Sequence, residues 1–384
     1  MEDKEKLNIL IFSWRGPDHP NAGGAETSTH EHAKGWVRAG YSVTLFTSDY
    51  AGANKQEIID GVNIIRSGSQ VLRVQIAALK WYLFAAHPKF DLTIDQFHGI
   101  PFFIPFFVRV KKLAFIHEVT KEIWKFNPWP KPWYFIPALF GSLLEPLIFR
   151  FLYRNIPFMT VSESTKKDLI SWGIGDGNIT VIHNGITVPK LKIPAKENKK
   201  TLIYLGSLSK DKGIEDALKV FSLLKNEDFR FWVVGKSDPE YLKSLKITSQ
   251  KLDIDKRVKF FGFVSEIRKY EMLAKAHILI NPSVREGWGL VVIEAARTGT
   301  PTVAYNVAGL KDSVINGKTG ILCNNMTPAN LAEEILKLLD DEKKLQGMSK
   351  QAIAWSKKFT WDKSVQKSLE LIKLLVDNKP TSLL

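Results

Sequence analysis

The sequence predicts two doubly wound α/β domains in tandem, facing each other across a cleft. Three observations favour this fold class. The chain has 384 residues, too long for one ordinary domain and enough for two with separate cores. Apolar runs rich in β-branched and aromatic residues alternate with amphipathic segments, as in parallel sheets covered by helices on both faces. Segment 187–200, TVPKLKIPAKENKK, interrupts this alternation once and is typical of a solvated linker.

The predicted elements follow the chain in two similar series. In the first half, strands are expected over residues 7–14, 41–48, 62–67, 91–97, 113–117, 158–162 and 179–184, and helices over 25–38, 72–86 and 163–172. In the second half, strands are expected over 201–206, 229–235, 258–263, 277–281 and 302–306, and helices over 214–224, 266–276, 290–297, 328–339 and 361–376.

The domain boundaries follow from these two series. We assign residues 1–187 to an N-terminal domain, 188–200 to a linker and 201–358 to a C-terminal domain. Residues 359–384 form a last helix that is expected to return to the N-terminal domain. Because ligands of parallel sheets bind at the carboxyl ends of the strands, the cleft is where chemistry is expected.

Composition narrows the class of protein. The only cysteine is Cys323, so an intrachain disulfide is impossible and a cytoplasmic location is expected. The first apolar run, of about seven residues, leads into a strand and is too short for a signal peptide. No apolar stretch is expected to reach the ~18 residues of a membrane-spanning helix, since segment 134–149 is interrupted by Pro137, Glu145 and Pro146. The net charge of +14 favours a polyanionic partner without identifying it.

Two glycine-containing segments follow predicted strands. In Asn21-Ala22-Gly23-Gly24-Ala25-Glu26, paired glycines at the start of a helix allow backbone N–H groups to approach an anion closely. In the segment 206–213, GSLSKDKG, a lysine at the mouth of the loop can bind a diphosphate as a point charge. Alone, the first pattern is as typical of a flexible turn as of an anion site, and the second is more typical of a solvated surface lysine than of a diphosphate ligand. The absence of G-x-G-x-x-G in the first segment argues against a dinucleotide cofactor.

A third segment, 285–295, reads REGWGLVVIEA and contains two glutamates, Glu286 and Glu294. Eight residues of helix are about 2.2 turns, so these carboxylates lie roughly 12 Å apart along the axis. That is too far for an acid and base acting on one bond, which requires at most ~9.5 Å. They can instead hold two ends of an extended ligand. Glu294 lies within an apolar helix, so its carboxylate needs a polar partner. The alternative to a ligand contact is that Glu294 forms a structural ion pair with another residue of the chain.

The stretch REGWGLVVIEA, followed by GTPTVAYNVAGLKDSVINGKTGIL, resembles the signature of glycosyltransferase family 4, whose members are retaining enzymes with the GT-B fold of two Rossmann-like domains. Four further segments agree in order and spacing: GGAE at 23–26, FIHE at 115–118, VSESTKKDLI at 161–170 and IHNGI at 182–186. The resemblance covers essentially the whole chain. It implies transfer of a hexose-type sugar from a UDP- or GDP-linked donor, with no separate cofactor and no metal ion.

The resemblance also implies roles for individual residues. Glu294 would bind the ribose hydroxyls, and Lys212 would neutralise the leaving diphosphate, aided by the amide of Gly24. His117 would meet the sugar from the acceptor side. Glu286, Gly287, Trp288, Gly289 and Leu290 would contact the donor sugar. Gly23 and Ser207 would contact the phosphates. The base would be contacted by Gly262, Phe263 and Val264.

One position departs from the family pattern. Family members usually have an arginine beside Gly206, where this chain has Ser207. The diphosphate site therefore lacks one positive charge. Lys210 and Arg285 are the residues that could compensate for it.

Three other functions are compatible with parts of the pattern. A nucleotide-sugar epimerase of the same fold would need no acceptor. A basic nucleic-acid-binding protein would fit the charge, but no known binding module is recognisable, so no nucleic-acid partner is expected. A catalytically inactive binding protein would fit Ser207, although Glu286, Glu294 and Lys212 argue against it. The eight histidines show no metal-binding spacing.

The segment 99–160 predicts contact with a membrane. Aromatic residues occupy 16 of its 62 positions, about 26%, whereas they make up 11% of the whole chain. The segment also has eight Lys or Arg and only three Glu. Between 124 and 153, Trp129, Trp133 and Phe135 are interleaved with prolines, a density expected to prevent a regular helix. Tryptophan and lysine together suit the headgroup region of an anionic bilayer. The alternatives are that these rings cover the acceptor site or form a protein interface. We expect a lipid-linked acceptor at the inner face of the cell membrane.

Overall fold

The computed structural model describes residues 6–70, 72–126, 135–225 and 227–378, with no description of the Phe140 side chain. The chain divides into two compact units. The first unit comprises Met1–Gly185 and Trp361–Leu384, and the second comprises Ile186–Thr360. The last helix, α13 (Trp361–Val376), therefore belongs to the same unit as the first half of the chain.

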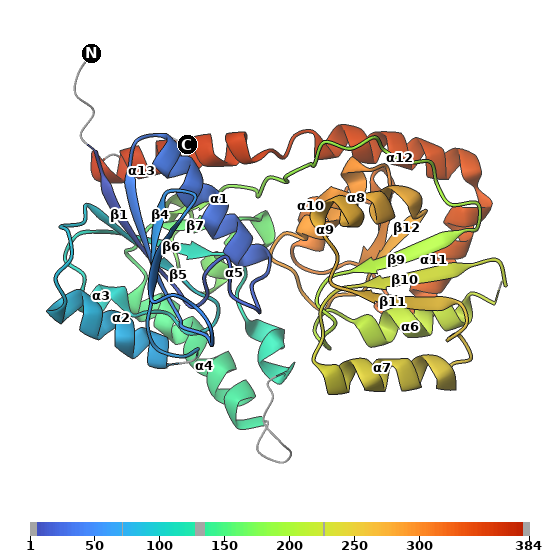
Figure 1. The fold of residues 1–384 in the computed structure, drawn as a ribbon, viewed down its shortest axis with the longest axis horizontal. Coiled ribbons are helices and arrows are strands. Elements are labelled where there is room, and N and C mark those ends of the chain that lie inside the picture. The colour runs from blue at the N-terminus through green and yellow to red at the C-terminus, as the bar shows by residue number, and fades with distance from the viewer. Residues whose placement is uncertain (1–5, 71, 127–134, 226, 379–384) are drawn as a thin grey trace. The chain divides into compact units, whose positions relative to one another are not determined.

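The first unit contains an eight-stranded sheet in the order β3-β4-β2-β1-β5-β6-β7-β8 (Figure 1). Its strands are β1 (Asn8–Ser13), β2 (Ser42–Thr47), β3 (Gln56–Ile59), β4 (Val62–Arg66), β5 (Leu92–Gln96), β6 (Lys111–Ile116), β7 (Phe158–Thr160) and β8 (Ile179–Val181). Every neighbouring pair is parallel except β3 and β4. The chain leaves β1 toward β2 and later returns to β5 on the other side of β1. The topological switch point, where parallel sheets bind ligands, thus lies between β1 and β5.

Helices cover both faces of this sheet. Leu10 and Phe12 of β1 share one apolar cluster with side chains of α2 (Arg73–Phe84), α3 (Ile104–Phe107), α4 (Phe135–Leu152) and α5 (Glu163–Ser171). Elsewhere in the unit, α1 (Gly24–Arg38) packs against α13, and the hydroxyl of Ser368 accepts a hydrogen bond from Trp36 at 2.8 Å. Two short 3-10 helices, Lys121–Phe126 and Asp176–Asn178, complete the unit.

The dense prolines at 128, 130 and 132 lie outside the described residues, so the expectation of no regular helix there stays a prediction. Within the rest of the stretch 124–153 a regular helix does form, helix α4. It runs for 18 residues and contains Pro137 in its first turn and Pro146 in its interior. A proline is tolerated in a first turn, because the N–H groups there have no intrahelical acceptor. Helix α4 is also long and apolar enough to cross a membrane by length and composition alone, which the sequence analysis did not foresee. Trp129 and Trp133 lie outside the described residues.

The second unit contains a six-stranded, wholly parallel sheet in the order β11-β10-β9-β12-β13-β14. Its strands are β9 (Thr201–Leu205), β10 (Arg230–Val234), β11 (Val258–Gly262), β12 (Ile278–Asn281), β13 (Thr302–Tyr305) and β14 (Gly320–Cys323). Its helices are α6 (Ile214–Leu223), α7 (Pro239–Lys251), α8 (Glu266–Lys275), α9 (Leu290–Arg297), α10 (Leu310–Ser313), α11 (Pro328–Asp340) and α12 (Glu342–Ser356). The switch point of this sheet lies between β9 and β12.

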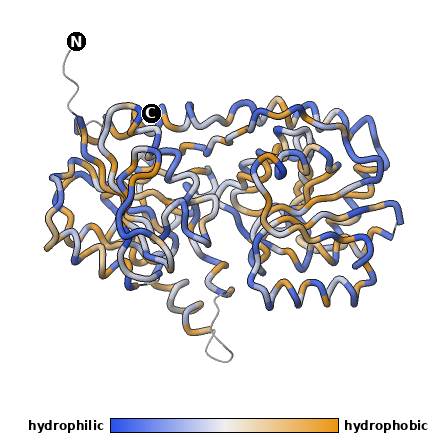
Figure 2. The backbone as a smooth tube through the Cα atoms, viewed as in Figure 1, coloured by the Kyte–Doolittle hydropathy of each residue, from blue (hydrophilic) through white to orange (hydrophobic). Residues whose placement is uncertain are grey.

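Two apolar clusters fill the space between this sheet and its helices. One joins the strands to α6, α7 and α11, and the other joins them to α8, α9 and α10. Figure 2 shows the hydrophobic colour concentrated in the strands of each unit. Both switch points are thus held by buried sheets, which fix the loops that follow β1, β5, β9 and β12.

Candidate active site

In the second unit, the loops that follow β9 and β12 carry Lys212 and Glu286. The ammonium of Lys212 lies 3.1 Å from Oε2 of Glu286 and 4.0 Å from the carboxylate of Asp211. The hydroxyl of Ser283 donates to Oε1 of Glu286 at 2.8 Å. The two sequence-predicted residues therefore form one charged pair at the switch point of the sheet.

The two loops are held against each other by backbone contacts. Gly213 has φ of 71°, and a side chain there would overlap the carbonyl of Pro282. The N–H of Val284 donates to the carbonyl of Asp211 at 2.9 Å. The hydroxyl of Tyr204 donates to the carbonyls of Ser207 and Lys212, at 2.8 and 3.2 Å. Burial and the charge of Glu286 raise the pKa of Tyr204, so its proton stays available for these bonds. The position of Lys212 is thus set by its backbone.

Glu294 lies on α9, and its carboxylate accepts from the ammonium of Lys269 on α8 at 2.8 Å. Lys269 also pairs with Glu266 at 2.8 Å. Burial raises the pKa of Glu294, and the positive charge of Lys269 opposes that rise. Burial lowers the pKa of Lys269, but the two carboxylates outweigh this effect and raise it. The expectation that Glu294 needs a polar partner is confirmed, and only one of its oxygens is used by Lys269.

The other predicted donor contacts of the second unit lie at the ends of β9, β11 and β12 or in the segments that follow them. Gly289 has φ of 78° and caps the N-terminus of α9. The Trp288 side chain is buried against Phe359, with ring centroids 5.0 Å apart, which leaves the backbone of this segment to contact a ligand. Phe263 is 72% exposed after β11, and the Lys236 ammonium lies 4.5 Å from its ring centroid. Ser207 and Lys210 are exposed, whereas the Arg285 side chain is buried.

The first unit holds the remaining predicted residues at its own switch point. Gly23 caps α1, and its N–H donates to Oε2 of Glu26 at 2.7 Å. The same carboxylate accepts from Nε1 of Trp14 at 3.2 Å and pairs with Arg15 at 3.3 Å. Glu26 therefore holds the loop that leads from β1 into α1, including Gly23 and Gly24. Sequence reasoning had included Glu26 in the motif without giving it this role.

His117 follows β6 and is 8% exposed. Burial, with smaller effects from His32 and His98, lowers the pKa of His117 to about 3, so the ring is neutral near pH 7. His98 and Glu118 lie beside it, with His98 Nδ1 4.0 Å from Glu118 Oε1. Neither His98 nor Lys269 was predicted. His98 could have been found from its position just after a predicted strand, but Lys269 has no signal in the sequence.

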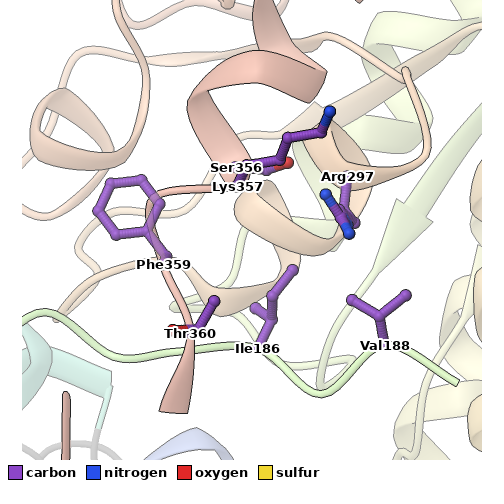
Figure 3. A pocket seen from close by; sticks show the side chains of 7 residues that line it. All are labelled: Ile186, Val188, Arg297, Ser356, Lys357, Phe359 and Thr360. Atoms are coloured by element: carbon purple, nitrogen blue, oxygen red, sulfur yellow. The ribbon is translucent and has the colours of Figure 1, made fainter. Parts of the chain in front are cut away.

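Two further features of the described residues bear on ligands. A pocket of about 140 Å³ in the second unit is lined by Ile186, Val188, Arg297, Ser356, Lys357, Phe359 and Thr360 (Figure 3). It includes none of the predicted site residues. Within the described ranges, no three His, Cys, Asp or Glu side chains are arranged to hold a metal ion.

Comparison with protein families gives two matches that together cover most of the chain. The family described as Glycosyltransferase Family 4 matches residues 22–188, and the family described as Glycosyl transferases group 1 matches residues 189–355. The border between the two matches falls at the start of the predicted linker.

Individual relatives agree with these matches. A glycogen synthase of Mycobacterium tuberculosis is 30% identical over 187 residues, 48% of this chain and 45% of that protein, so the match spans about half the relative's length. An uncharacterized glycosyltransferase of Methanocaldococcus jannaschii is 24% identical over 97% of this chain and 99% of its own.

Solved structures share the fold at low identity. The sucrose-phosphate synthase of Thermosynechococcus elongatus has a TM-score of 0.82 and 19% identity, over 97% of this chain and 100% of that one. The Anabaena protein HepE, solved in complex with UDP and glucose, has a TM-score of 0.72 and 18% identity, over 96% of this chain and 99% of that one.

Proposed function

Because this chain belongs to glycosyltransferase family 4 and is a group 1 glycosyltransferase with the GT-B fold, we propose that it transfers a hexose with retention of anomeric configuration. The donor is a nucleotide-diphosphate sugar. The acceptor is a lipid-linked glycan at the inner face of the cell membrane. Membership of this family sets aside the epimerase and the basic binding protein.

The donor site is assigned to the second unit. Glu294 has one carboxylate oxygen committed to Lys269, and the other is assigned to the ribose hydroxyls. Glu286, fixed by Ser283 and Lys212, is assigned to the hydroxyls of the sugar. A HepE structure contains UDP-glucose, which supports a nucleotide sugar as ligand of this fold. The single observation that carries the proposal is the Lys212–Glu286 pair at the switch point between β9 and β12.

Retention is proposed from the family resemblance. The site itself supports the transfer step by offering cationic stabilisation of the leaving group, which either stereochemical course requires. Lys212 and the N-terminus of α9 provide positive charge where the departing diphosphate would accumulate negative charge. In the absence of donor, Glu286 neutralises Lys212. A bound diphosphate would compete for the lysine and leave Glu286 to accept hydrogen bonds from the sugar.

The membrane assignment is supported by α4. Its outward residues are large and apolar: Phe135, Leu139, Leu143, Leu144, Leu147 and Phe151 are between 46% and 72% exposed. Only 12% of this apolar helix is buried. An exposed apolar surface of this kind marks an interaction site.

We assign α4 to the surface of the bilayer rather than to a span across it. Glu145 of α4 is 2% exposed and accepts from the N–H of Thr120 and from Nε1 of Trp124, both at 2.8 Å. Gly141 of the same helix lies directly under the Trp124 ring. Insertion of α4 across a membrane would break these bonds and leave a carboxylate in hydrocarbon, at a cost of several kcal/mol.

A panel of UDP- and GDP-linked hexoses, tested for thermal stabilisation of the full chain, examines the donor assignment. A ligand present at about 100 times its Kd stabilises the folded state by about 2.7 kcal/mol, which raises the Tm by several degrees. At least one nucleotide sugar should raise the Tm, and the corresponding free hexose should not. A panel without any stabilising nucleotide sugar contradicts the donor assignment.

A further inference from the structure

A second polar cluster lies at the switch point of the first unit, between the ends of β1, β5 and β6. Ser13, the last residue of β1, donates to Oε1 of Gln96, the last residue of β5, at 2.5 Å. His98 and Glu118 each lie two residues beyond a strand, β5 and β6 respectively. The Trp14 ring lies 6.3 Å from the His98 ring. Ser13 and Gln96 are buried, whereas Trp14, His98 and Glu118 are partly exposed at the strand ends, where a parallel sheet binds its ligand.

Several polar atoms of this cluster are buried and make no hydrogen bond to the residues that the structure describes. They are Oε2 of Glu118, Oγ1 of Thr120, Nε2 of Gln96 and Nε2 of His117. Gln96, Thr120 and His117 are all less than 9% exposed. Buried polar groups in folded proteins are nearly always paired with protein or with ordered water, so this group offers hydrogen-bonding positions that ligand hydroxyls can take in place of water.

The loops that carry the cluster are rigidly held. Oδ1 of buried Asp95 accepts from the N–H of Phe102 at 3.2 Å, and its Oδ2 accepts from the Tyr153 hydroxyl at 2.5 Å. Glu145 holds the second loop through the N–H of Thr120. Gly99 has φ of 79°, and a side chain there would come within 3.1 Å of Thr120 Oγ1. The unpaired atoms therefore cannot easily turn toward other partners within the protein.

We propose that Glu118 and His98, with Thr120, bind the hydroxyl groups of a neutral sugar ring of the acceptor. This inference rests on the proposed function and specifies its acceptor. The free oxygen of Glu118 needs a donor, which a sugar hydroxyl supplies. A carboxylate repels phosphate and uronic acid groups, so any phosphate of a lipid carrier must lie away from these residues. Trp14 adds an aromatic ring beside the site, next to His98.

Saturation-transfer NMR with methyl glycosides tests the proposal without requiring turnover. The probes are the methyl glycosides of glucose, galactose and mannose, together with methyl glucuronide, and the protein is the full chain. At least one neutral glycoside should bind the wild type about tenfold more tightly than the glucuronide does, since like-charge repulsion disfavours the latter. Glu118→Gln should reduce this preference to about threefold or less, and Glu118→Leu should weaken neutral glycosides about tenfold.

Glu122→Gln is the matched control, because it removes the same charge from the same loop four residues away. It should bind every glycoside as the wild type does. Thermal unfolding separates a ligand-binding role from a structural one. Because Oε2 of Glu118 has no partner among the described residues, Glu118→Gln should leave the Tm unchanged or raise it.

The proposal is overturned if no neutral glycoside binds the wild type, if the glucuronide binds better, or if Glu118→Gln and Glu118→Leu leave the preferences unchanged. A drop in the Tm of Glu118→Gln, without a change in glycoside preference, would show that Glu118 stabilises the fold and does not bind the sugar. UDP and GDP titrated in parallel report on the proposed function itself. If one of them binds while the glycosides fail, only the acceptor inference falls.

Discussion

At the scale of single residues, Lys269 controls whether the Glu294 carboxylate is ionised when it meets a ligand. The carboxylate of Glu294 is largely buried, which raises its pKa, and the Lys269 ammonium at 2.8 Å opposes this effect. Glu266 and Tyr270 are the other titratable groups that interact with Glu294, and both lie on α8 together with Lys269. Helix α8 therefore controls the charge of a residue on α9.

Lys269→Met should therefore change the pH dependence of nucleotide binding. Without the ammonium, the pKa of Glu294 rises further. On acidification, the carboxylate of the variant is therefore protonated at a higher pH than that of the wild type. The acid limb of the UDP- or GDP-binding profile should move up by about one pH unit or more. Calorimetric titrations between pH 5 and pH 8 measure it, with Lys269→Arg as the variant that keeps the charge. An unchanged profile in Lys269→Met would show that Glu294 does not contact the nucleotide as an ionised group.

Ser207 gives a second prediction at this scale. An arginine at this exposed position, beside the loop of Lys212, would supply the charge that family members usually have. Ser207→Arg should tighten the binding of the nucleoside diphosphate by about 1.5–3 kcal/mol, the range of a charge-assisted hydrogen bond. Titration calorimetry with UDP and GDP gives the answer. No gain, or a loss, would mean that another cation already occupies the place.

Single residues also show how far sequence reasoning reaches into the site. Lys212 and Glu286 could be predicted because each follows a strand in a glycine-containing segment, and strand ends meet at one edge of a parallel sheet. Lys269 could not be predicted, since it meets Glu294 across 25 residues and its helix shows only an ordinary charged face. Glu118 is the last residue of the motif FIHE at 115–118, and nothing in the sequence gives it a role of its own. Its unpaired oxygen is a property of packing.

At the scale of elements, strands were easier to predict than the helices between them. The runs 201–206 and 302–306 agree closely with β9 and β13, because a buried parallel strand is largely apolar. Helix α4 was not predicted, because it directly follows a proline-dense segment and contains Pro137 and Pro146 itself, although a first turn accepts a proline such as Pro137. Helices α7 and α12 were also missed, since each has a weakly amphipathic sequence with many charges.

The outward face of α4 predicts binding to anionic vesicles. Leu139, Leu143 and Leu147 changed together to Ser should reduce flotation with anionic liposomes at ~0.15 M salt by removing apolar area from the contact. The variant with Trp129, Trp133 and Phe135 changed to Ser tests the neighbouring segment. Leu223, Ile247 and Leu336 of the second unit, between 36% and 44% exposed, form the matched control set. If wild type does not float, or all variants float equally, α4 is not a membrane contact.

The contact between α1 and α13 predicts a specific packing defect. A side chain at Gly35 would overlap the methyl groups of Val365. Gly35→Ala should therefore lower the free energy of unfolding by about 1–3 kcal/mol through overpacking. Val365→Ala should restore part of that loss in the double variant, although it is destabilising alone. Thermal unfolding of the three variants measures this coupling, and purely additive losses would show that the two helices do not meet here.

At the scale of the whole molecule, the two units have the same architecture and different chemistry. Each has its polar residues at the switch point of a parallel sheet, as the sequence predicted from its repeated alternation. The second unit carries the Lys212–Glu286 and Lys269–Glu294 pairs that we assign to the donor. The first unit carries His117, His98 and Glu118, which we assign to the acceptor side. The two units are also connected through α13, which follows the second unit in the sequence and belongs to the first unit.

The central claim is that the enzyme transfers a hexose from a nucleotide sugar with retention, using Lys212 and Glu294. The most direct measurement incubates the full chain with membrane lipid extract and the nucleotide sugar that stabilises it, and determines the anomeric configuration of the new linkage by NMR. Retention predicts a product with the configuration of the donor. Lys212→Ala and Glu294→Ala should each reduce turnover by about tenfold to a hundredfold or more, while remaining folded. An inverted product, or near-normal turnover by both variants at saturating donor, would contradict it.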